Sequence, residues 1–213
     1  MEIVFVLDCS GSMGGCESDV IGGFNRMIKD QLEQEQDTLV TTVLFNNSTC
    51  DLHDRVPIAH IAPLTNNDYR PSGCTALLDA IGETMKRIKT AHRYAREEDL
   101  PHKTLFVVMT DGLENASRHY SNKQIQTMVK QQEAEHDWEF VFIGADIDAF
   151  ASARSLGIRE ERAVSFSKAE DSFEDCFDSV GEVAYRISRC SRKAHLSDDA
   201  FADAFKIFGK KQK

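Results

Sequence analysis

Near its start the chain reads Ile3-Val4-Phe5-Val6-Leu7-Asp8-Cys9-Ser10-Gly11-Ser12. An apolar run of this kind, bounded by a Gly-Ser turn, is typical of a strand that is buried on both faces. The strand ends in an Asp-x-Ser-x-Ser pattern, which places one carboxylate and two hydroxyls at its carboxyl end. In an open α/β sheet this is the edge at which ligands bind. Oxygen ligands of this kind suit a hard divalent cation such as Mg²⁺ rather than zinc or copper.

Polar residues of the same kind occur at two later points in the chain. Thr75 begins a strongly helical segment, Gly73-Cys74-Thr75-Ala76-Leu77-Leu78-Asp79-Ala80-Ile81. A second buried strand ends in an aspartate, in Thr104-Leu105-Phe106-Val107-Val108-Met109-Thr110-Asp111-Gly112. Each residue alone has a structural explanation, because serine and threonine cap helices and Asp-Gly is a common turn pair. Their joint occurrence at successive strand ends favours a metal site instead.

This three-part pattern resembles the von Willebrand factor A (VWA) domain, in which these elements form the metal-ion-dependent adhesion site (MIDAS). The resemblance covers residues 1–190 in order and spacing, and it points to the bacterial, intracellular members of the family. It implies that Mg²⁺ or Mn²⁺ is held directly by the two serines, directly or through water by the threonine, and largely through water by the two aspartates. The implied metal residues are Asp8, Ser10, Ser12, Thr75 and Asp111.

The charge of such a site predicts what it binds. Two carboxylates only neutralise a divalent cation, while hydroxyls and water add no charge. A vacant coordination position therefore attracts one more anionic oxygen, such as an Asp or Glu carboxylate from another protein. We expect a magnesium-dependent protein–protein interaction module, an adaptor rather than an enzyme. Bacterial relatives often act beside AAA+ ATPases or in stress and tellurite-resistance systems, and the resemblance extends that expectation to this chain.

A magnesium-dependent hydrolase or phosphatase that uses the same strand-end site is the alternative. Phosphatases with an aspartate nucleophile carry a second aspartate two residues later, but here that position is Ser10, so the general acid is missing. The chain has no Gly-x-Ser-x-Gly elbow and no Gly-x-x-x-x-Gly-Lys-Ser/Thr loop. Gly11, Gly14 and Gly15 have the wrong spacing for a dinucleotide site. We therefore expect no catalytic residues and no organic cofactor.

Length, charge and cysteine usage narrow the function further. At 213 residues the chain has material for one well-packed domain, and its formal charge of −10 argues against nucleic-acid binding, which needs a basic surface. No apolar stretch approaches the roughly 20 residues that span a bilayer, and the short apolar start lacks the basic flank of a secretory leader. None of the six cysteines lies in a Cys-x-x-Cys pair. These features predict free thiols, a cytoplasmic location and no membrane partner.

Strand and helix patterns alternate along the chain. Continuous apolar runs predict buried strands, and apolar residues at helical spacing predict the helices between them. The expected strands cover 3–7, 39–45, 49–56, 105–109, 140–143 and 163–166, and the expected helices cover 19–34, 75–96, 121–135, a short segment ending at 156, and 172–188. This order predicts a Rossmann-like, doubly wound α/β fold, with a mostly parallel sheet of about six strands and helices on both faces. The alternating pattern of 49–56 is expected of one antiparallel edge strand.

The last part of the chain, residues 191–213, differs in character. A polar linker precedes a helix that begins near Ser197, and Phe201, Phe205 and Phe208 follow at helical spacing. This segment is either an amphipathic helix packed on its own domain or a helix that docks on a partner.

Three loops at the metal edge, residues 46–54, 64–74 and 112–120, are expected to select the partner. Tyrosine and arginine are enriched at the hot spots of protein interfaces. The candidate contact residues are Asn46, Asn47, Tyr69, Arg70, Arg118, His119 and Tyr120. Cys9 and Cys74 flank the metal residues, and we expect both thiols to be packed and inert.

Overall fold

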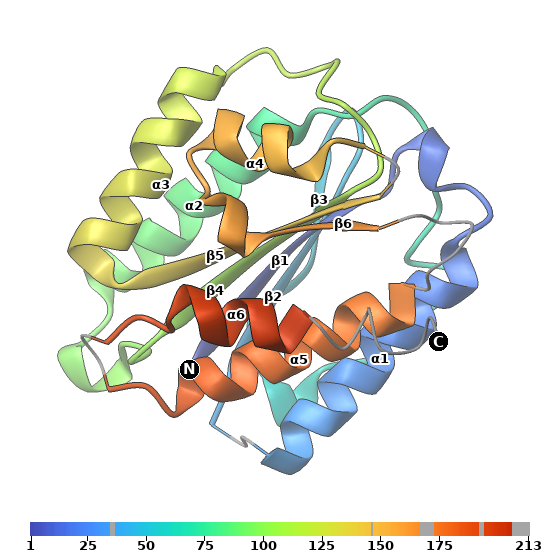
Figure 1. The fold of residues 1–213 in the computed structure, drawn as a ribbon. Coiled ribbons are helices and arrows are strands. Elements are labelled where there is room, and N and C mark those ends of the chain that lie inside the picture. The colour runs from blue at the N-terminus through green and yellow to red at the C-terminus, as the bar shows by residue number, and fades with distance from the viewer. Residues whose placement is uncertain (35–36, 146, 167–172, 192–193, 206–213) are drawn as a thin grey trace.

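The computed structural model describes residues 1–34, 37–145, 147–166, 173–191 and 194–205. Within these residues a six-stranded sheet runs through the centre, in the spatial order β3-β2-β1-β4-β5-β6 (Figure 1). The strands are β1 (Glu2–Asp8), β2 (Leu39–Phe45), β3 (Thr49–Pro57), β4 (Thr104–Thr110), β5 (Trp138–Ala145) and β6 (Ala163–Phe166). β3 pairs antiparallel with β2 at one edge, and the other neighbouring strands pair in parallel. The predicted fold class, a doubly wound and mostly parallel α/β sheet with one antiparallel edge strand, is confirmed.

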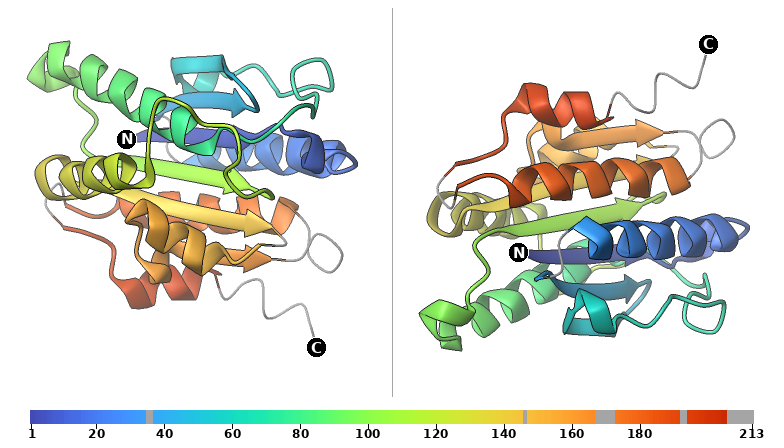
Figure 2. Two further views of the ribbon diagram at one scale, coloured as in Figure 1. Left: turned by 90° about the horizontal axis from the view of Figure 1, so that it is seen from above. Right: turned by 90° about the horizontal axis from the view of Figure 1, so that it is seen from below.

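Helices cover both faces of the sheet. α1 and α5 pack on one face, whereas α2, α3 and α4 pack on the other (Figure 2). The helices are α1 (Glu17–Gln34), α2 (Leu77–Tyr94), α3 (Asn122–His136), α4 (Ala149–Leu156), α5 (Phe173–Ser188) and α6 (Asp198–Phe205). Short 3₁₀ turns lie at η1 (Gly11–Met13), η2 (Ile58–His60), η3 (Glu97–Asp99) and η4 (Glu160–Arg162). No described helix combines the length and the apolar content needed to cross a membrane.

The central strand β1 is buried along its whole length. Successive side chains of a strand point to opposite faces, so Phe5 and Leu7 pack towards α1 and α5, whereas Val4 and Val6 pack towards the helices of the other face. The Phe5 ring meets Phe24 of α1 edge-on, with ring centroids 5.4 Å apart. Truncating a buried ring of this kind costs about 3–5 kcal/mol. The continuous apolar run therefore anchors β1, and with it the polar residues that follow.

Strand register brings the two predicted aspartates together. β1 and β4 are neighbouring parallel strands, with Leu7 paired to Met109. Both strands consequently end at the same edge of the sheet, β1 at Asp8 and β4 at Thr110. Asp111 is the next residue of the chain. The aspartates thus stand at adjacent strand ends, on the edge where ligands bind in folds of this type.

The helix predicted from Thr75 begins later, at Leu77. The two preceding amides are engaged outside the helix, because Thr75 N donates to Asn115 Oδ1 (2.9 Å) and Ala76 N donates to the Asn46 carbonyl (2.8 Å). The capping residue of α2 is Ala76, whose side chain makes no capping hydrogen bond. Thr75 is therefore not a helix cap, and its position is set by loops at the carboxyl edge of the sheet.

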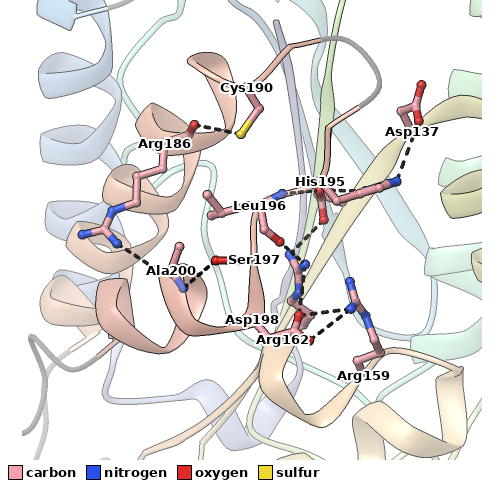
Figure 3. Close-up of polar contacts among 11 residues, drawn as sticks. Asp137, Arg159, Arg162, Arg186, Cys190, His195, Leu196, Ser197, Asp198 and Ala200 are labelled. Carbon is pink, nitrogen blue, oxygen red and sulfur yellow. Dashed lines mark hydrogen bonds and ion pairs between the residues drawn. The ribbon is translucent and has the colours of Figure 1, made fainter.

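Helix α6 is attached to the domain through a buried arginine in the turn η4. The Arg162 side chain is 1% exposed, and its Nη1 lies 2.8 Å from Glu139 Oε2 of β5. Its Nη2 donates to the Leu196 carbonyl (2.7 Å), in the segment that leads into α6 (Figure 3). The guanidinium lies 3.4 Å from the centroid of the Phe201 ring, a cation–π contact with α6 itself.

Of the three phenylalanines predicted to form an apolar stripe, two lie in the described residues. Phe201 is fully buried, and Phe205 is partly buried against the same core as α5. Phe208 lies outside the described residues. The apolar side of α6 thus packs on its own domain at Phe201.

Candidate metal centre

Asp8 is held in place by hydrogen bonds from three sides. Its carboxylate accepts from the Ser10 amide at Oδ1 (2.7 Å) and from the Thr110 hydroxyl at Oδ2 (2.5 Å). Its backbone carbonyl accepts from the buried Tyr69 hydroxyl (2.5 Å). The residue is 1% exposed, so a single orientation of its carboxylate is enforced.

A chain of hydroxyl and carboxylate oxygens continues from Asp8 to the next strand. The Ser10 and Ser12 hydroxyl oxygens lie 3.1 Å apart, and Ser12 Oγ donates to Asp111 Oδ1 (2.6 Å). Ser10 is 1% exposed and Asp111 is 7% exposed, whereas Ser12 is exposed to solvent. The site is therefore buried on the protein side and open at Ser12.

Thr75 reaches the same place through Gly112. A β-carbon added to Gly112 would lie 3.0 Å from Thr75 Oγ1 and 3.7 Å from Ser12 Oγ. A larger residue at this position would crowd the Thr75 hydroxyl, so the glycine allows Thr75 to approach closely. All five predicted metal residues thus converge at one edge of the sheet.

Negative charge accumulates at this edge. Burial raises the pKa of the Asp8 carboxyl above its ordinary value, and the neighbouring Asp111 carboxylate raises it as well. Hydrogen bonds from Thr110 and Ser10 act in the opposite direction and offset only part of the rise. In the described part of the chain, the polar contacts of Asp8 are hydrogen bonds from neutral groups. A bound cation would compensate this charge.

The oxygen spacing fits a small divalent cation. In octahedral magnesium coordination, with each oxygen about 2.1 Å from the ion, neighbouring oxygens lie about 3.0 Å apart. The separations of 3.1 Å between Ser10 and Ser12 and 2.6 Å between Ser12 and Asp111 are close to that value. Among the described residues, no group of three or more His, Cys, Asp or Glu side chains is placed to hold a metal. A cation here would therefore depend on hydroxyls and two carboxylates, a ligand set that suits Mg²⁺ or Mn²⁺.

Two further carboxylates near the site have structural tasks. Glu114 accepts hydrogen bonds from the backbone amides of Leu78 (2.9 Å) and Ser117 (2.7 Å). It therefore caps the amino end of α2 and also fixes the loop that contains Ser117. Asp79 accepts from three consecutive amides, of residues 118–120. Burial tends to raise the pKa of Asp79, but these amides lower it on balance. The two side chains hold the loop 112–120 against α2. This role depends on tertiary contacts, so the sequence pattern does not indicate it.

Two expectations from the sequence are wrong. The sequence predicts that Tyr69 contacts a partner, but the residue is 1% exposed and its hydroxyl donates to the Asp8 carbonyl. The sequence predicts that Cys74 is packed, but it is exposed. Its backbone amide donates to Asn47 Oδ1 (2.9 Å), and this hydrogen bond holds Cys74 at the loop surface. Cys9 is buried in the core as predicted.

The sequence and the fold agree on a family. The family model of the von Willebrand factor type A domain matches residues 2–178, most of the chain. The chain belongs to this family. No protein with a curated description is similar enough in sequence to be matched with this VWA domain.

Solved structures with the same VWA fold come from several different organisms. The vWF domain of the type V pili tip protein Mfa5 from Porphyromonas gingivalis has a TM-score of 0.58 at 13% identity, covering 92% of this chain and 98% of that one. Proximal thread matrix protein 1 from the mussel byssus has a TM-score of 0.57 at 17% identity over 92% of this chain, which spans 48% of the mussel protein's length. The manganese-loaded TRAP protein of Plasmodium vivax has a TM-score of 0.52 at 20% identity, covering 80% of this chain and 69% of that one. At these identities the likeness is one of fold.

Proposed function

We propose that this VWA domain is a magnesium- or manganese-dependent protein-binding adaptor whose metal completes its coordination with an Asp or Glu carboxylate of the partner. The observation that carries the proposal is the linked set Ser10, Ser12 and Asp111, with oxygens 3.1 and 2.6 Å apart and an exposed side at Ser12. Domains of this family often mediate metal-dependent protein interactions, and a relative was solved with manganese bound.

The charge balance of the site supports a carboxylate ligand from outside. Its protein carboxylates are Asp8 and Asp111, which together neutralise a divalent cation. A third anionic oxygen is still attracted to the ion, whereas a cage of three or four protein carboxylates would repel it.

The surface beside the site supports a protein partner. Leu113 is 65% exposed and follows Asp111 closely in the loop 112–120. Large exposed apolar side chains next to a polar site are common in protein interfaces. Arg118 and His119 on the same loop are exposed as well, so they remain candidate contact residues.

Binding without catalysis is part of the proposal. A hydrolase that used Asp8 as nucleophile would need a free carboxylate and an acid or base beside it. The Asp8 carboxylate oxygens instead accept hydrogen bonds from Ser10 and Thr110. The nearby Glu114 and Asp79 are occupied by backbone amides. We therefore expect no metal-dependent phosphatase, nuclease or peptidase turnover.

A reducing compartment suits the cysteines. None of the six forms a disulfide in the structure, and two of them, Cys50 and Cys74, are exposed. Exposed thiols persist where glutathione and thioredoxin keep them reduced. We therefore propose a cytoplasmic location, and the family resemblance suggests an assembly with an AAA+ ATPase or a stress or tellurite-resistance system as the setting.

Isothermal titration with MgCl₂ and MnCl₂ tests the metal site. The wild-type protein should bind one ion, and Ser12→Ala and Asp111→Asn should each weaken binding at least about tenfold, because each removes a group from a site that already lacks a full protein cage. Ser18→Ala is the matched control, since Ser18 is an exposed serine of α1 outside the site. Unchanged binding in both site variants would overturn the metal assignment.

Capture of a partner tests the interaction. Protein bound from native lysate in Mg²⁺ should be released by a chelator and should fail to bind the Ser12→Ala variant. Substituting the acidic residue of that partner should cost about 2–5 kcal/mol of binding free energy, as when a buried charge loses its oppositely charged partner. A double-mutant cycle between Ser12 and that residue should be non-additive, and strict additivity would mean that the metal is structural only.

A further inference from the structure

A hollow lies directly beside the metal centre, at the amino end of α2. Its volume is about 800 Å³, large for a ligand pocket. Cys74 and Ala76, which flank the predicted metal residue Thr75, both line it. One wall is the turn between β2 and β3, and the other is the loop 112–120. A ligand bound to the metal would therefore have this hollow next to it.

Two asparagines, one on each wall of the hollow, are fixed through their side-chain oxygens. Asn47 Oδ1 accepts from the Cys74 amide (2.9 Å), and Asn115 Oδ1 accepts from the Thr75 amide (2.9 Å). A backbone amide can only donate, so the atom that faces it must be the asparagine oxygen and not the nitrogen. The Nδ2 amino group lies on the other branch of each planar side-chain amide. The orientation of both side chains is thereby determined.

Contacts with the backbone make both asparagines rigid. The Asn115 amide donates to the Thr75 carbonyl (3.1 Å), so Asn115 is bound to Thr75 through its backbone as well as its side chain. Asn47 packs on Gly73, where an added β-carbon would collide with Asn47 Oδ1 and where a φ of +77° also favours glycine. Side chains that are already fixed lose little conformational freedom when they bind a ligand.

The amino groups of Asn47 and Asn115 are available to a ligand. Neither Nδ2 donates to another residue in the described part of the chain, and both side chains are exposed to solvent. Two carboxylates line the hollow, but Asp79 is already bound by the amides of residues 118–120, and Glu83 lies further along α2. The two amino groups therefore suit acceptors that a ligand brings, such as peptide carbonyls.

We propose that this hollow binds the main chain of an extended partner segment whose Asp or Glu side chain reaches the metal. The proposal rests on the metal-dependent function proposed above and names the form of the partner. Backbone carbonyls beside the acidic residue accept hydrogen bonds from Asn47 Nδ2 and Asn115 Nδ2. A helix uses its carbonyls in its own hydrogen bonds, whereas an extended segment offers them to the protein that binds it.

Small probes test the proposal on the wild-type protein in saturating Mg²⁺, followed by ¹⁵N NMR. The peptides Ala-Ala-Asp-Ala-Ala and Ala-Ala-Glu-Ala-Ala, capped at both ends, carry a carboxylate and a main chain. Acetate carries the carboxylate alone, and capped Ala-Ala-Asn-Ala-Ala carries the main chain alone. The tighter acidic peptide should bind at least about tenfold more tightly than acetate, because two hydrogen bonds are added. The side-chain NH₂ signals of Asn47 and Asn115 should shift with this peptide and stay in place with acetate.

Two substitutions remove the donors and keep the oxygens that hold residues 74 and 75. Asn47→Asp and Asn115→Asp should each weaken the acidic peptide about tenfold, while the affinity for Mn²⁺ is retained or raised by the added negative charge. A new carboxylate that only repelled anions would weaken acetate by the same factor, so the peptide should lose more affinity than acetate. Asn122→Asp is the matched control, at an exposed asparagine of α3 that does not line the hollow.

The proposal is overturned if acetate binds as tightly as both acidic peptides, a result that would leave the contact between metal and carboxylate intact. It is also overturned if the asparagine peptide binds as tightly as the acidic ones, or if Asn47→Asp and Asn115→Asp weaken peptide and acetate by equal factors or not at all. Failure of both acetate and the acidic peptides to bind in Mg²⁺ would overturn the proposed function, and this inference with it. Titration with Mn²⁺ alone would then show whether the metal site itself remains.

Discussion

Ser12 Oγ donates a hydrogen bond to Asp111 Oδ1 at 2.6 Å, although 99 positions separate the two residues in the chain. A serine hydroxyl has one proton and two lone pairs, so donating the proton to Asp111 orients the lone pairs away from that carboxylate. The Ser10 hydroxyl, 3.1 Å away, is then placed to donate to one of them, and Ser12 is exposed, so a cation can approach its oxygen from solvent. The same hydrogen bond that links the two strand ends therefore prepares Ser12 to bind a cation.

This relationship predicts coupling between Ser12 and Asp111 in metal binding. Ser12→Ala and Asp111→Asn should each lower the affinity for Mn²⁺, and the double variant should lose less than the sum, with a coupling energy on the order of 0.5–3 kcal/mol. Titration calorimetry of the four proteins measures it. Ser18 and Asp19 form an exposed hydrogen-bonded pair at 3.3 Å and serve as the control cycle, for which additive and negligible effects are expected. Additivity at the site would mean that Ser12 and Asp111 do not serve one ion.

The hydrogen bond from Thr110 to Asp8 predicts a stability effect. Thr110→Val keeps the side-chain shape but leaves Asp8 Oδ2 without this donor in a fully buried position. The free energy of unfolding should fall by about 1–3 kcal/mol, the cost of an unsatisfied buried acceptor. Urea denaturation measures the change. Thr90→Val, at an exposed threonine that donates to the Lys86 carbonyl, should change the stability by less than about 0.5 kcal/mol. Equal effects at the two positions would contradict the role given to Thr110.

The fold, and the meeting of the predicted site residues at one edge of the sheet, could be predicted from the sequence for a physical reason. β1 and β4 are buried on both faces, so they appear as continuous apolar runs whose ends are visible in the sequence. The polar residues after such runs, Asp8 and Asp111, must then lie at the carboxyl edge of the sheet. Parallel pairing of neighbouring strands brings them together without any further information.

The supporting residues were not accessible in the same way. Tyr69 lies in a loop, and its burial depends on how residues 64–74 fold back onto the Asp8 carbonyl, a contact across 61 positions. Glu114 and Asp79 are acidic residues in polar surroundings, and only the packing of the loop 112–120 on α2 turns them into caps. Arg162 is a charged residue that a sequence pattern places at the surface, yet it is buried because Glu139 and Leu196 meet it there. Each of these depends on tertiary contacts that local periodicity does not encode.

The buried pair of Arg162 and Glu139 predicts the stability of the α6 attachment. Arg162→Met should lower the free energy of unfolding by about 3–5 kcal/mol, because it leaves Glu139 buried at 2% exposure without its cationic partner. Urea denaturation gives the value. Arg154→Met is the matched control, since Arg154 pairs with Glu160 on the surface and such pairs contribute about 0–1 kcal/mol. A loss below 1 kcal/mol at Arg162 would show that the attachment of α6 does not depend on this ion pair.

His53 predicts a loss of stability in mild acid. The residue is 7% exposed and stacks on Phe24, and burial lowers its pKa, although a hydrogen bond to the Ala62 backbone and the charge of Asp68 raise it in part. In the unfolded chain this histidine is protonated below about pH 6.5, whereas in the folded chain it resists protonation. Its contribution to the free energy of unfolding is therefore fully present above this pH and is lost as the pH falls. The slope for one proton is at most about 1.4 kcal/mol per pH unit.

Urea denaturation between neutral and mildly acidic pH, with His53→Leu beside the wild type, measures this contribution. The variant should lose less stability on acidification than the wild type. His60→Gln, at an exposed histidine, should follow the wild-type pH dependence. The assignment is wrong if His53→Leu and the wild type show the same pH dependence.

The exposed Leu113 predicts a separation of partner binding from metal binding. If a partner carboxylate reaches the metal, the surface around that carboxylate covers Leu113, which is 65% exposed. Leu113→Ser should then weaken partner binding by more than about 1 kcal/mol, which is about fivefold in affinity. The affinity for Mn²⁺ and the free energy of unfolding should stay within error, because the side chain contributes little to the folded core. Tyr94→Ser is the matched control, since Tyr94 is 78% exposed at the far end of α2 and should not touch a partner at the metal edge. Titration in saturating Mg²⁺ measures the partner affinity of the wild type and both variants. A loss of metal affinity in Leu113→Ser would place the residue inside the metal centre, and an unchanged partner affinity would place the interface on other loops.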